Sequence, residues 1–281
     1  MVGSMAGFTL NDSFMKAVSD TVPLFQAIFL RGMATTFFML CLALFVGGLR
    51  FRLSGSNWRL IGMRTITEIG AAYFFLSAIF NMEFANAAAI LQVLPLTITL
   101  AGAVFLGEPV GWRRWTAIFV GFFGVMLIVR PGFDGFTIYS VYVLIAVFLV
   151  TVRDILVRKL TSDVPTLMVA TLNAISVTAF FGIGSIWVEW TPVDGTVIWP
   201  LLAAALLIVG GYIFSVSAMR VGEVAVVAPF RYTALLWALF LGLVVFGEWP
   251  DWIALVGATI VVLTGIYTFR REMILSRNAE Q

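Results

Sequence analysis

The sequence contains no histidine, the side chain that most often binds a metal ion or acts as a general base near neutral pH. A single cysteine, Cys41, lies in an apolar run, so no disulfide can form within the chain, and it is expected to be a small buried hydrophobe. The pattern of an ATP-binding loop, G-x-x-x-x-G-K-[ST], is absent, as is any cluster with metal-ligand spacing. No cofactor is therefore expected, and ATP is not expected to drive the work of this chain.

Charged residues are scarce as well. They make up 11% of the chain, against about 25% in average soluble domains. Hydrophobic residues make up 61%, and the mean hydropathy is +1.04. A soluble protein with so little charge could not cover its surface, so the composition indicates a membrane protein whose surroundings are the lipid bilayer.

Apolar stretches near the length that crosses a bilayer, about 20 residues, follow one another with short connections. Ten helices are expected, at approximately 1–19, 24–46, 60–80, 84–106, 115–129, 138–157, 166–188, 198–219, 224–246 and 252–269. The first is unusually polar and lacks the continuous apolar core and cleavage site of a signal peptide. A short polar tail is expected to end at Gln281. The expected fold class is an all-α membrane protein with ten transmembrane helices.

One stretch of the sequence occurs twice, which points to a duplicated half rather than to short solenoid repeats. Residues 70–130 recur 140 positions later without a gap, and the matched pairs include Glu83 and Glu223, Gly102 and Gly242, Trp112 and Trp252, and Arg130 and Arg270. Upstream the offset is 142, which matches Asp12 with Asp154 and Arg31 with Asn173. The expected repeats are residues 1–137 and 138–281, with five helices each. Because five is odd, the two copies should enter the membrane from opposite sides as an inverted repeat.

The basic residues are distributed unevenly between alternate connections. If the N-terminus is inside, the inner side holds Arg50, Arg52, Arg59, Arg64, Arg113, Arg114, Arg158, Lys159, Arg220, Arg270, Arg271 and Arg277. The outer side holds one basic residue, Arg130, and the acids Asp20, Glu83, Asp134, Glu189, Asp194, Glu248 and Asp251. Lys/Arg bias sets orientation, so both termini are expected in the cytoplasm; a dual-topology protein would need a near balance.

These features resemble the paired EamA domains of the drug/metabolite transporter superfamily. The resemblance covers essentially the whole chain, and its most specific pieces are Pro23–Arg31, the turn Gly107–Glu108–Pro109 with its repeat Gly247–Glu248–Trp249, and the run Gly121–Gly132. It implies ten helices in two inverted five-helix halves around a central cavity, in a carrier of small metabolites, most often outward, in a bacterial inner membrane. It fixes neither substrate nor direction. Asn173, where the first half has Arg31, implies an asymmetric cavity.

Ionisable side chains inside expected membrane helices are the first candidates for a functional site because they are costly there. Arg31 and Arg231 have no acid three or four residues away, so we expect them to line a cavity and hold a solute carboxylate, which a guanidinium fork matches. A structural pair with Glu68 or Asp12 is the alternative. Asp12 and Glu68 are the candidates for proton coupling. Asp12 and Lys16 could instead pair along their helix, and Asp154 could pair with Arg153 or Arg158.

Uncharged polar and aromatic side chains complete the expected solute site, and helix packing is the alternative role for each. They are Asn11, Tyr73, Gln92, Asn173, Tyr212, Tyr232 and Trp237, with Asn86 as a further candidate. Gln92 and Tyr232 occupy equivalent positions in the two halves, and Pro95 and Pro229 lie close to them. Interrupted helices are where transporters tend to place binding sites, although a plain kink is the alternative.

The expected function is a secondary transporter that moves an amino-acid-like or other carboxylate-bearing metabolite by alternating access, with export as the expected direction. The first alternative is an importer of a vitamin, a nucleoside-like or a sulfonium metabolite. Two alternatives belong to other classes: a membrane enzyme, disfavoured by the missing catalytic constellation, and a non-transporting membrane scaffold, disfavoured by the arginines within the helices. The expected partners are a small solute and the lipid bilayer, with no nucleic acid; a homodimer is left open.

Overall fold

The computed structural model describes residues 1–46, 53–105, 107, 111–130, 137–161, 164–221 and 227–279. Within these ranges every regular element is a helix. They are α1 (Val2–Ala17), α2 (Leu24–Val46), α3 (Gly55–Asn81), α4 (Phe84–Leu91), α5 (Leu94–Phe105), α6 (Trp112–Val129), α7 (Ile138–Arg158), α8 (Thr166–Gly184), η1 (Ser185–Trp187), α9 (Gly195–Val221), η2 (Ala228–Tyr232), α11 (Thr233–Phe246) and α12 (Trp252–Ala279).

Eight helical segments of the described chain are long and apolar enough to cross a membrane by length and composition. α1 and α3 are not among them, because α1 is short, with 16 residues, and α3 carries Arg59, Arg64 and Glu68. Both nevertheless lie inside the bundle, where α3 packs along α7 and α1 packs along α9. The protein is therefore an all-helical, multi-pass membrane protein.

Several expected helix limits are wrong, and the two largest differences, in α3 and α12, have a local reason. α3 begins at Gly55 rather than near residue 60, because the Ser54 hydroxyl accepts a hydrogen bond from the Asn57 amide (3.3 Å) and caps the helix start. α12 continues to Ala279 instead of ending near residue 269 in a polar tail, since residues 270–279 include good helix formers such as Arg, Glu, Met and Leu. α6 begins at Trp112 and α9 at Gly195, each three residues earlier than expected.

The helices expected at 84–106 and 224–246, each with an internal proline, are both interrupted. α4 ends at Leu91 and α5 begins at Leu94, with Pro95 as its second residue, where a missing amide hydrogen is tolerated. In the second half, Pro229 lies at the start of the short helix η2, and α11 follows directly. The interruption expected from the two prolines is thus confirmed, at Gln92 and at the equivalent Tyr232. Residues 222–226 lie outside the described part of the chain.

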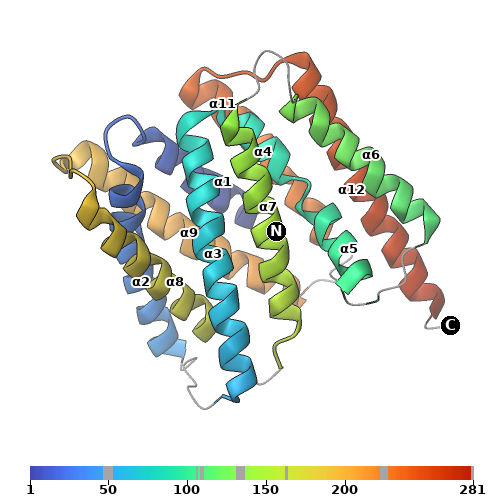
Figure 1. The fold of residues 1–281 in the computed structure, drawn as a ribbon, viewed down its shortest axis with the longest axis horizontal. Coiled ribbons are helices and arrows are strands. Elements are labelled where there is room, and N and C mark those ends of the chain that lie inside the picture. Colours follow the sequence, from blue (N-terminus) through green and yellow to red (C-terminus); the bar gives the residue numbers. More distant parts are fainter. Residues whose placement is uncertain are drawn as a thin grey trace.

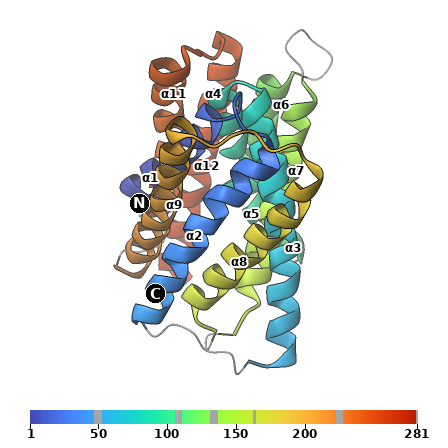
Figure 2. The same cartoon turned by 90° about the vertical axis from the view of Figure 1, so that its left-hand side faces the viewer.

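Helix pairs organise the bundle. α6 and α12 lie side by side along one edge, and α2 and α8 lie together at the opposite edge (Figure 1). Figure 2, turned by 90°, shows α2 and α8 crossing in front of the central helices. Glycine permits the closest approaches, since a Cβ added at Gly124 of α6 would meet the Gly257 carbonyl oxygen of α12 at 2.8 Å. The α1–α9 crossing is similar, with Gly7 against Gly211 and a hydrogen bond from the Ser4 hydroxyl to the Gly211 carbonyl (2.7 Å).

The two ends of the bundle differ in charge. At the end where α1, α3, α6 and α11 finish, Asp20, Glu83, Glu248 and Asp251 lie around one cavity; we call this the acidic end. At the opposite end, where α6 begins, Arg113 and Arg114 lie near Arg271 of α12; we call this the basic end. Arg50, Arg52 and Asp134, which the sequence assigns to the connections, lie outside the described residues.

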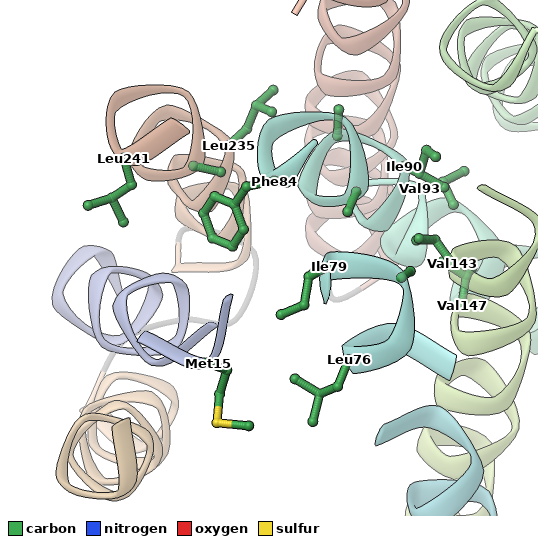
Figure 3. Packing of buried hydrophobic residues seen from close by; sticks show 14 of the residues in the cluster. Met15, Leu76, Ile79, Phe84, Ile90, Val93, Val143, Val147, Leu235 and Leu241 are labelled. Carbon is green, nitrogen blue, oxygen red and sulfur yellow. The ribbon is translucent and has the colours of Figure 1, made fainter. Parts of the chain in front are cut away.

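Between the ends lies one continuous cluster of buried apolar side chains. Figure 3 shows Met15 of α1, Leu76 and Ile79 of α3 and Phe84 of α4 pointing into the same space, with Leu235 and Leu241 of α11 beside them. Cys41, expected to be buried, is exposed on α2. That expectation was wrong because an exposed position on a membrane-crossing helix faces lipid, where a small apolar side chain is as well placed as in the core.

Candidate functional site

Arg31 of α2, one of the two expected solute-binding arginines, is held by Asn11 of α1. Its Nε and Nη2 donate to the Asn11 Oδ1 at 3.2 and 2.9 Å, and the Asn11 Nδ2 donates to the Asp12 Oδ1 at 2.8 Å. No ion pair joins Arg31 to Asp12 among the described residues, although the two charges lie within electrostatic range of each other. The structure therefore brings three of the predicted residues together, with a neutral amide between two opposite charges.

Glu68 of α3, the second candidate for proton coupling, is surrounded by arginines. The Arg153 Nη1 of α7 lies 3.1 Å from the Glu68 Oε2, and the Arg64 Nη2 lies 3.7 Å from the same oxygen. Arg153 also pairs with its neighbour Asp154 at 2.8 Å, as one of the sequence alternatives proposed. Glu68 is thus neutralised by two cations, whereas the described contacts of Asp12 include only one hydrogen bond, from an amide.

Arg231, the other expected arginine, differs from Arg31. It is half-buried in η2, and the structure gives its guanidinium no hydrogen bond or ion pair with any described residue. It lies within electrostatic range of Asp154 and Arg153, and Arg31 lies within range of Glu68. The charges around Asn11 and those around Glu68 therefore lie within electrostatic range of each other, and Arg231 lies within range of the second group. Together they hold the carboxylates of Asp12, Glu68 and Asp154 and the guanidiniums of Arg31, Arg64, Arg153 and Arg231, an excess of one positive charge.

Three of the uncharged candidates are enclosed by the bundle. Gln92 is buried at the interruption between α4 and α5. Tyr232, at the equivalent interruption, is only 4% exposed and packs against α12, where Gly265 leaves room for its ring and Phe269 meets it edge-on. The Tyr232 hydroxyl and the Asn173 Oδ1 are buried without a hydrogen-bond partner. Of these atoms, the Tyr232 hydroxyl lies against Gly265 of α12 and within electrostatic range of Arg231.

The remaining candidates lie apart from one another. The Tyr73 ring packs between those of Phe25 and Phe74, with centroids 6.0 and 5.3 Å away. The Tyr212 hydroxyl donates to the Thr166 carbonyl at 3.2 Å, and Trp237 is half-buried on α11. The ring contacts of Tyr73 are those of helix packing, its alternative role, whereas Tyr212 also lies within electrostatic range of Arg64.

The sequence did not predict a cavity of about 910 Å³ at the acidic end. Of the residues singled out from the sequence for a solute site, only Asn86 lines it. Burial and the carboxylates of Glu248 and Asp251 raise the pKa of Glu83, which lies on this cavity. Arg130 pairs with Asp251 here, from α6 to the start of α12. The repeated Gly–Glu turn was the sequence signal, but it was interpreted as a turn alone.

Lys16 makes the other unexpected contact at this cavity. Its Nζ lies 2.9 Å from the Glu248 Oε1 and donates to the Met82 carbonyl at 2.7 Å. The sequence alternative in which Lys16 pairs with Asp12 along α1 is wrong, because Lys16 reaches across to the α11–α12 turn instead. Among the described residues, no group of three or more His, Cys, Asp or Glu side chains could hold a metal ion.

Comparisons with known proteins identify a family and relatives that match most of the chain. The profile of the EamA-like transporter family matches residues 1–130 and 137–270. A riboflavin transporter of Vibrio cholerae is 28% identical over 223 residues, which are 79% of this chain and 74% of that protein. An S-adenosylmethionine uptake transporter of Rickettsia conorii is 25% identical over 182 residues, 64% of this chain and 60% of that protein.

Two further matches extend over nearly the full length. The pseudopaline exporter CntI of Pseudomonas aeruginosa is 22% identical over 278 residues, covering 97% of this chain and 96% of that protein. A solved crystal structure superposes with a TM-score of 0.65 at 19% identity, over 95% of this chain and 96% of that chain, which shows a shared fold. The relatives carry different solutes in different directions, so they point to a transporter rather than an enzyme without naming its cargo. Since the family profile matches both halves, this chain belongs to the EamA-like transporter family.

Proposed function

We propose that this protein is a secondary transporter that exports a small amino-acid-like solute across a bacterial inner membrane by alternating access. The observation that carries the proposal is the Asn11 bridge between Arg31 and Asp12. A direct ion pair would neutralise both groups. The bridge instead holds a guanidinium and a carboxylate close together inside the membrane without pairing them, and this is the arrangement that a zwitterion requires.

The hydrogen-bonding groups of Arg31 and Asp12 that have no described partner within the protein fit such a solute. A guanidinium has five N–H donors, and the contacts of Arg31 with Asn11 use its Nε and one hydrogen of Nη2. The remaining donors can hold a solute carboxylate in bidentate geometry. Asp12 keeps its Oδ2 for a solute ammonium group, since the described hydrogen bond to its side chain goes to Oδ1. Arg231, which has no described partner, supplies the second proposed carboxylate contact, from the other half.

Helix packing supports the inverted repeat of residues 1–137 and 138–281, with ten membrane crossings. The sequence repeat relates α1 to α7, α3 to α9 and α5 to α11. If each helix is replaced by its counterpart in the other half, the contact between α3 and α7 becomes the contact between α9 and α1. Both contacts are present, and they are among the most extensive in the bundle. The same replacement turns the contact of α5 with α7 into that of α11 with α1, which is present as well. In this scheme α1 and α3 cross the membrane as polar helices shielded by their neighbours.

The orientation follows from the charged ends. The basic end faces the cytoplasm and the acidic end faces outward, because Lys and Arg are retained on the cytoplasmic side. Both termini are then cytoplasmic. Alternating access arises when the two halves rock about a site near the midplane, where inverted repeats place their solutes.

A matched set of ligands tests the zwitterion directly. The purified protein is screened with the common amino acids by thermal shift, and the best ligand is compared with its amide, which lacks the carboxylate, and its deaminated acid, which lacks the ammonium. Loss of either charge should weaken binding at least tenfold, since charge-assisted hydrogen bonds contribute roughly 1.5–3 kcal/mol. If the amide and the deaminated acid bind as tightly as the parent amino acid, the zwitterion is excluded.

A second function is favoured by two of the relatives. One is named a riboflavin transporter and another an S-adenosylmethionine uptake transporter, so import of a vitamin, nucleoside-like or sulfonium metabolite on the same fold is the alternative. Both compounds belong in the same thermal-shift panel. Binding of riboflavin without binding of any amino acid would replace the first proposal by this one.

A further inference from the structure

We infer that Lys16 is the closing element of a gate at the acidic end, which shuts the path to the central charges by tying the two halves together. A gate has a purpose only if the protein is a transporter, so the inference rests on the proposed function. The experiment that tests the gate does not depend on that function. Lys16, with its partners Glu248, Met82 and Phe84, is called the Lys16 clamp below.

The clamp joins four elements at one point. The Lys16 Nζ at the end of α1 binds the Glu248 Oε1 (2.9 Å) of the α11–α12 turn and the Met82 carbonyl (2.7 Å) of the α3–α4 turn. The Glu248 Oε2 accepts the Phe84 amide at the start of α4 (2.8 Å), where the helix dipole also favours a negative charge. Lys16, Met82 and Phe84 belong to the first sequence repeat and Glu248 to the second, so the clamp crosses the boundary along which the halves must move.

The geometry of the clamp is fixed by its surroundings. Gly247 adopts a left-handed conformation (φ 64°) that ends α11, and the Glu248 amide donates back to the Gly242 carbonyl at 2.8 Å, which aims the Glu248 side chain at α4. The Lys16 side chain is 11% exposed and its Nζ lies 5.3 Å from the centre of the Phe246 ring. An ion pair this enclosed is weakly screened by salt, unlike a surface pair. Lys16 therefore has two favourable contacts with the second repeat, to Glu248 and Phe246, that a sliding of the halves would break together, while its bond to Met82 lies within the first repeat.

Next to the Lys16 clamp, away from the cavity, lies a layer of apolar side chains that are buried from solvent. It consists of five buried side chains, which we call the apolar layer: Met15, Leu76, Ile79, Phe84 and Leu241 (Figure 3). None of them lines the 910 Å³ cavity, whereas Lys16, Glu248 and Phe246 do. The clamp and the layer are also covalently linked, since Met15 precedes Lys16 and Phe84 itself supplies the clamped amide. Release of Lys16 would therefore free the side chains that keep water from the centre.

An accessibility assay tests the gate without any solute, so that its failure is separate from a failure of the zwitterion proposal. In a Cys41→Ser background, which removes the exposed native thiol, Ile79→Cys places a thiol in the apolar layer. A membrane-impermeant maleimide is applied from each side of membrane vesicles. Phe80→Cys, which lies on the cavity, is the positive control and should react quickly from the acidic side in every background.

The clamp predicts that Lys16→Ala and Glu248→Gln each raise the labelling rate of Ile79→Cys from the acidic side at least tenfold. Lys16→Arg keeps the charge and the donors and should leave labelling slow. Arg130→Gln, which breaks the other ion pair of the same cavity, is the matched control and should also leave it slow. Unchanged labelling in Lys16→Ala and Glu248→Gln would overturn the gate, and so would equal acceleration by Arg130→Gln, because that result would show general loosening of this end.

Discussion

A single amide, that of Asn11, sets the relation between Arg31 and Asp12. Its carbonyl oxygen accepts from the guanidinium and its amino group donates to the carboxylate, so both charges are oriented without being cancelled. In the second half the repeat places Arg153 where Asn11 lies, and Asn173 where Arg31 lies. The arginine and the asparagine have exchanged positions between the halves, and this makes the centre asymmetric.

Arg31→Lys keeps the charge but loses the planar fork, so solute affinity should fall about tenfold to a hundredfold, the equivalent of roughly 1.5–3 kcal/mol. Thermal stability in detergent is measured beside affinity, for this variant and for Arg231→Lys. If both variants bind the solute normally and only their melting temperatures fall, the arginines serve folding and not binding.

Asp12 and Glu68, which the sequence could not distinguish as proton carriers, are separated by their surroundings. Glu68 is held between Arg64 and Arg153, so Glu68→Gln should destabilise the protein by up to about 3 kcal/mol, because a partly buried ion pair then loses one partner. Asp12→Asn should cost little stability and should abolish accumulation driven by a pH gradient while sparing counterflow exchange. Gradient-driven accumulation that survives in Asp12→Asn would remove this carboxylate from the coupling mechanism.

The sequence predicted the residue types of the site better than their contacts. Arg31, Asp12 and Glu68 stand out because an isolated charge in an apolar run needs an explanation. Their partners come from other helices: Asn11 lies 20 residues from Arg31, and Arg153 lies 85 residues from Glu68. Helical periodicity relates only residues on the same helix, so it could not find these pairs, and the alternative partner that it offered for Lys16, Asp12, was wrong.

At the scale of elements, close helix crossings and two interrupted helices shape the bundle. Proline positions predicted the interruptions, because proline removes a backbone donor wherever it occurs. Helix starts were predicted less well, since a single serine hydroxyl moved the start of α3 by five residues. The tightest crossing, between α6 and α12, brings Gly124 and Gly257 backbone to backbone.

Gly257→Ala should lower thermal stability by about 1–3 kcal/mol, because its new Cβ would lie 2.5 Å from the Gly124 carbonyl oxygen and the helices would have to separate. Gly62→Ala on α3 is the control. It has open space around the added methyl group and should be neutral or slightly stabilising, since alanine favours helix. Equal melting temperatures for the two variants would show that the α6–α12 crossing is not tightly packed.

At the scale of the whole molecule, two independent observations support the proposed inverted repeat. They are the duplicated sequence and the exchange of helix partners between the halves. The uneven distribution of basic residues supports the proposed orientation, which no helix contact can supply. In the described part of the chain, Arg113, Arg114 and Arg271 gather at one end and Asp20, Glu83, Glu248 and Asp251 at the other.

The proposed topology predicts the side on which reporters appear. A fusion at Gln281 should report the cytoplasm, and an insertion in the loop that holds Asp194 should report the outside. A matched insertion near Lys159, at the basic end, serves as the cytoplasmic control within the chain. Placement of the Gln281 and Asp194 reporters on the same side would contradict ten crossings in two inverted halves.

Solute exchange in proteoliposomes tests the central claim most directly. Vesicles containing the purified protein are loaded with an unlabelled amino acid, and entry of the labelled form is followed for the wild type and for Arg31→Gln. The account predicts saturable exchange for the wild type that the corresponding amide does not compete for, and at least a tenfold loss in Arg31→Gln. Exchange that is equally rapid in Arg31→Gln, or that the amide inhibits as well as the amino acid does, would contradict it.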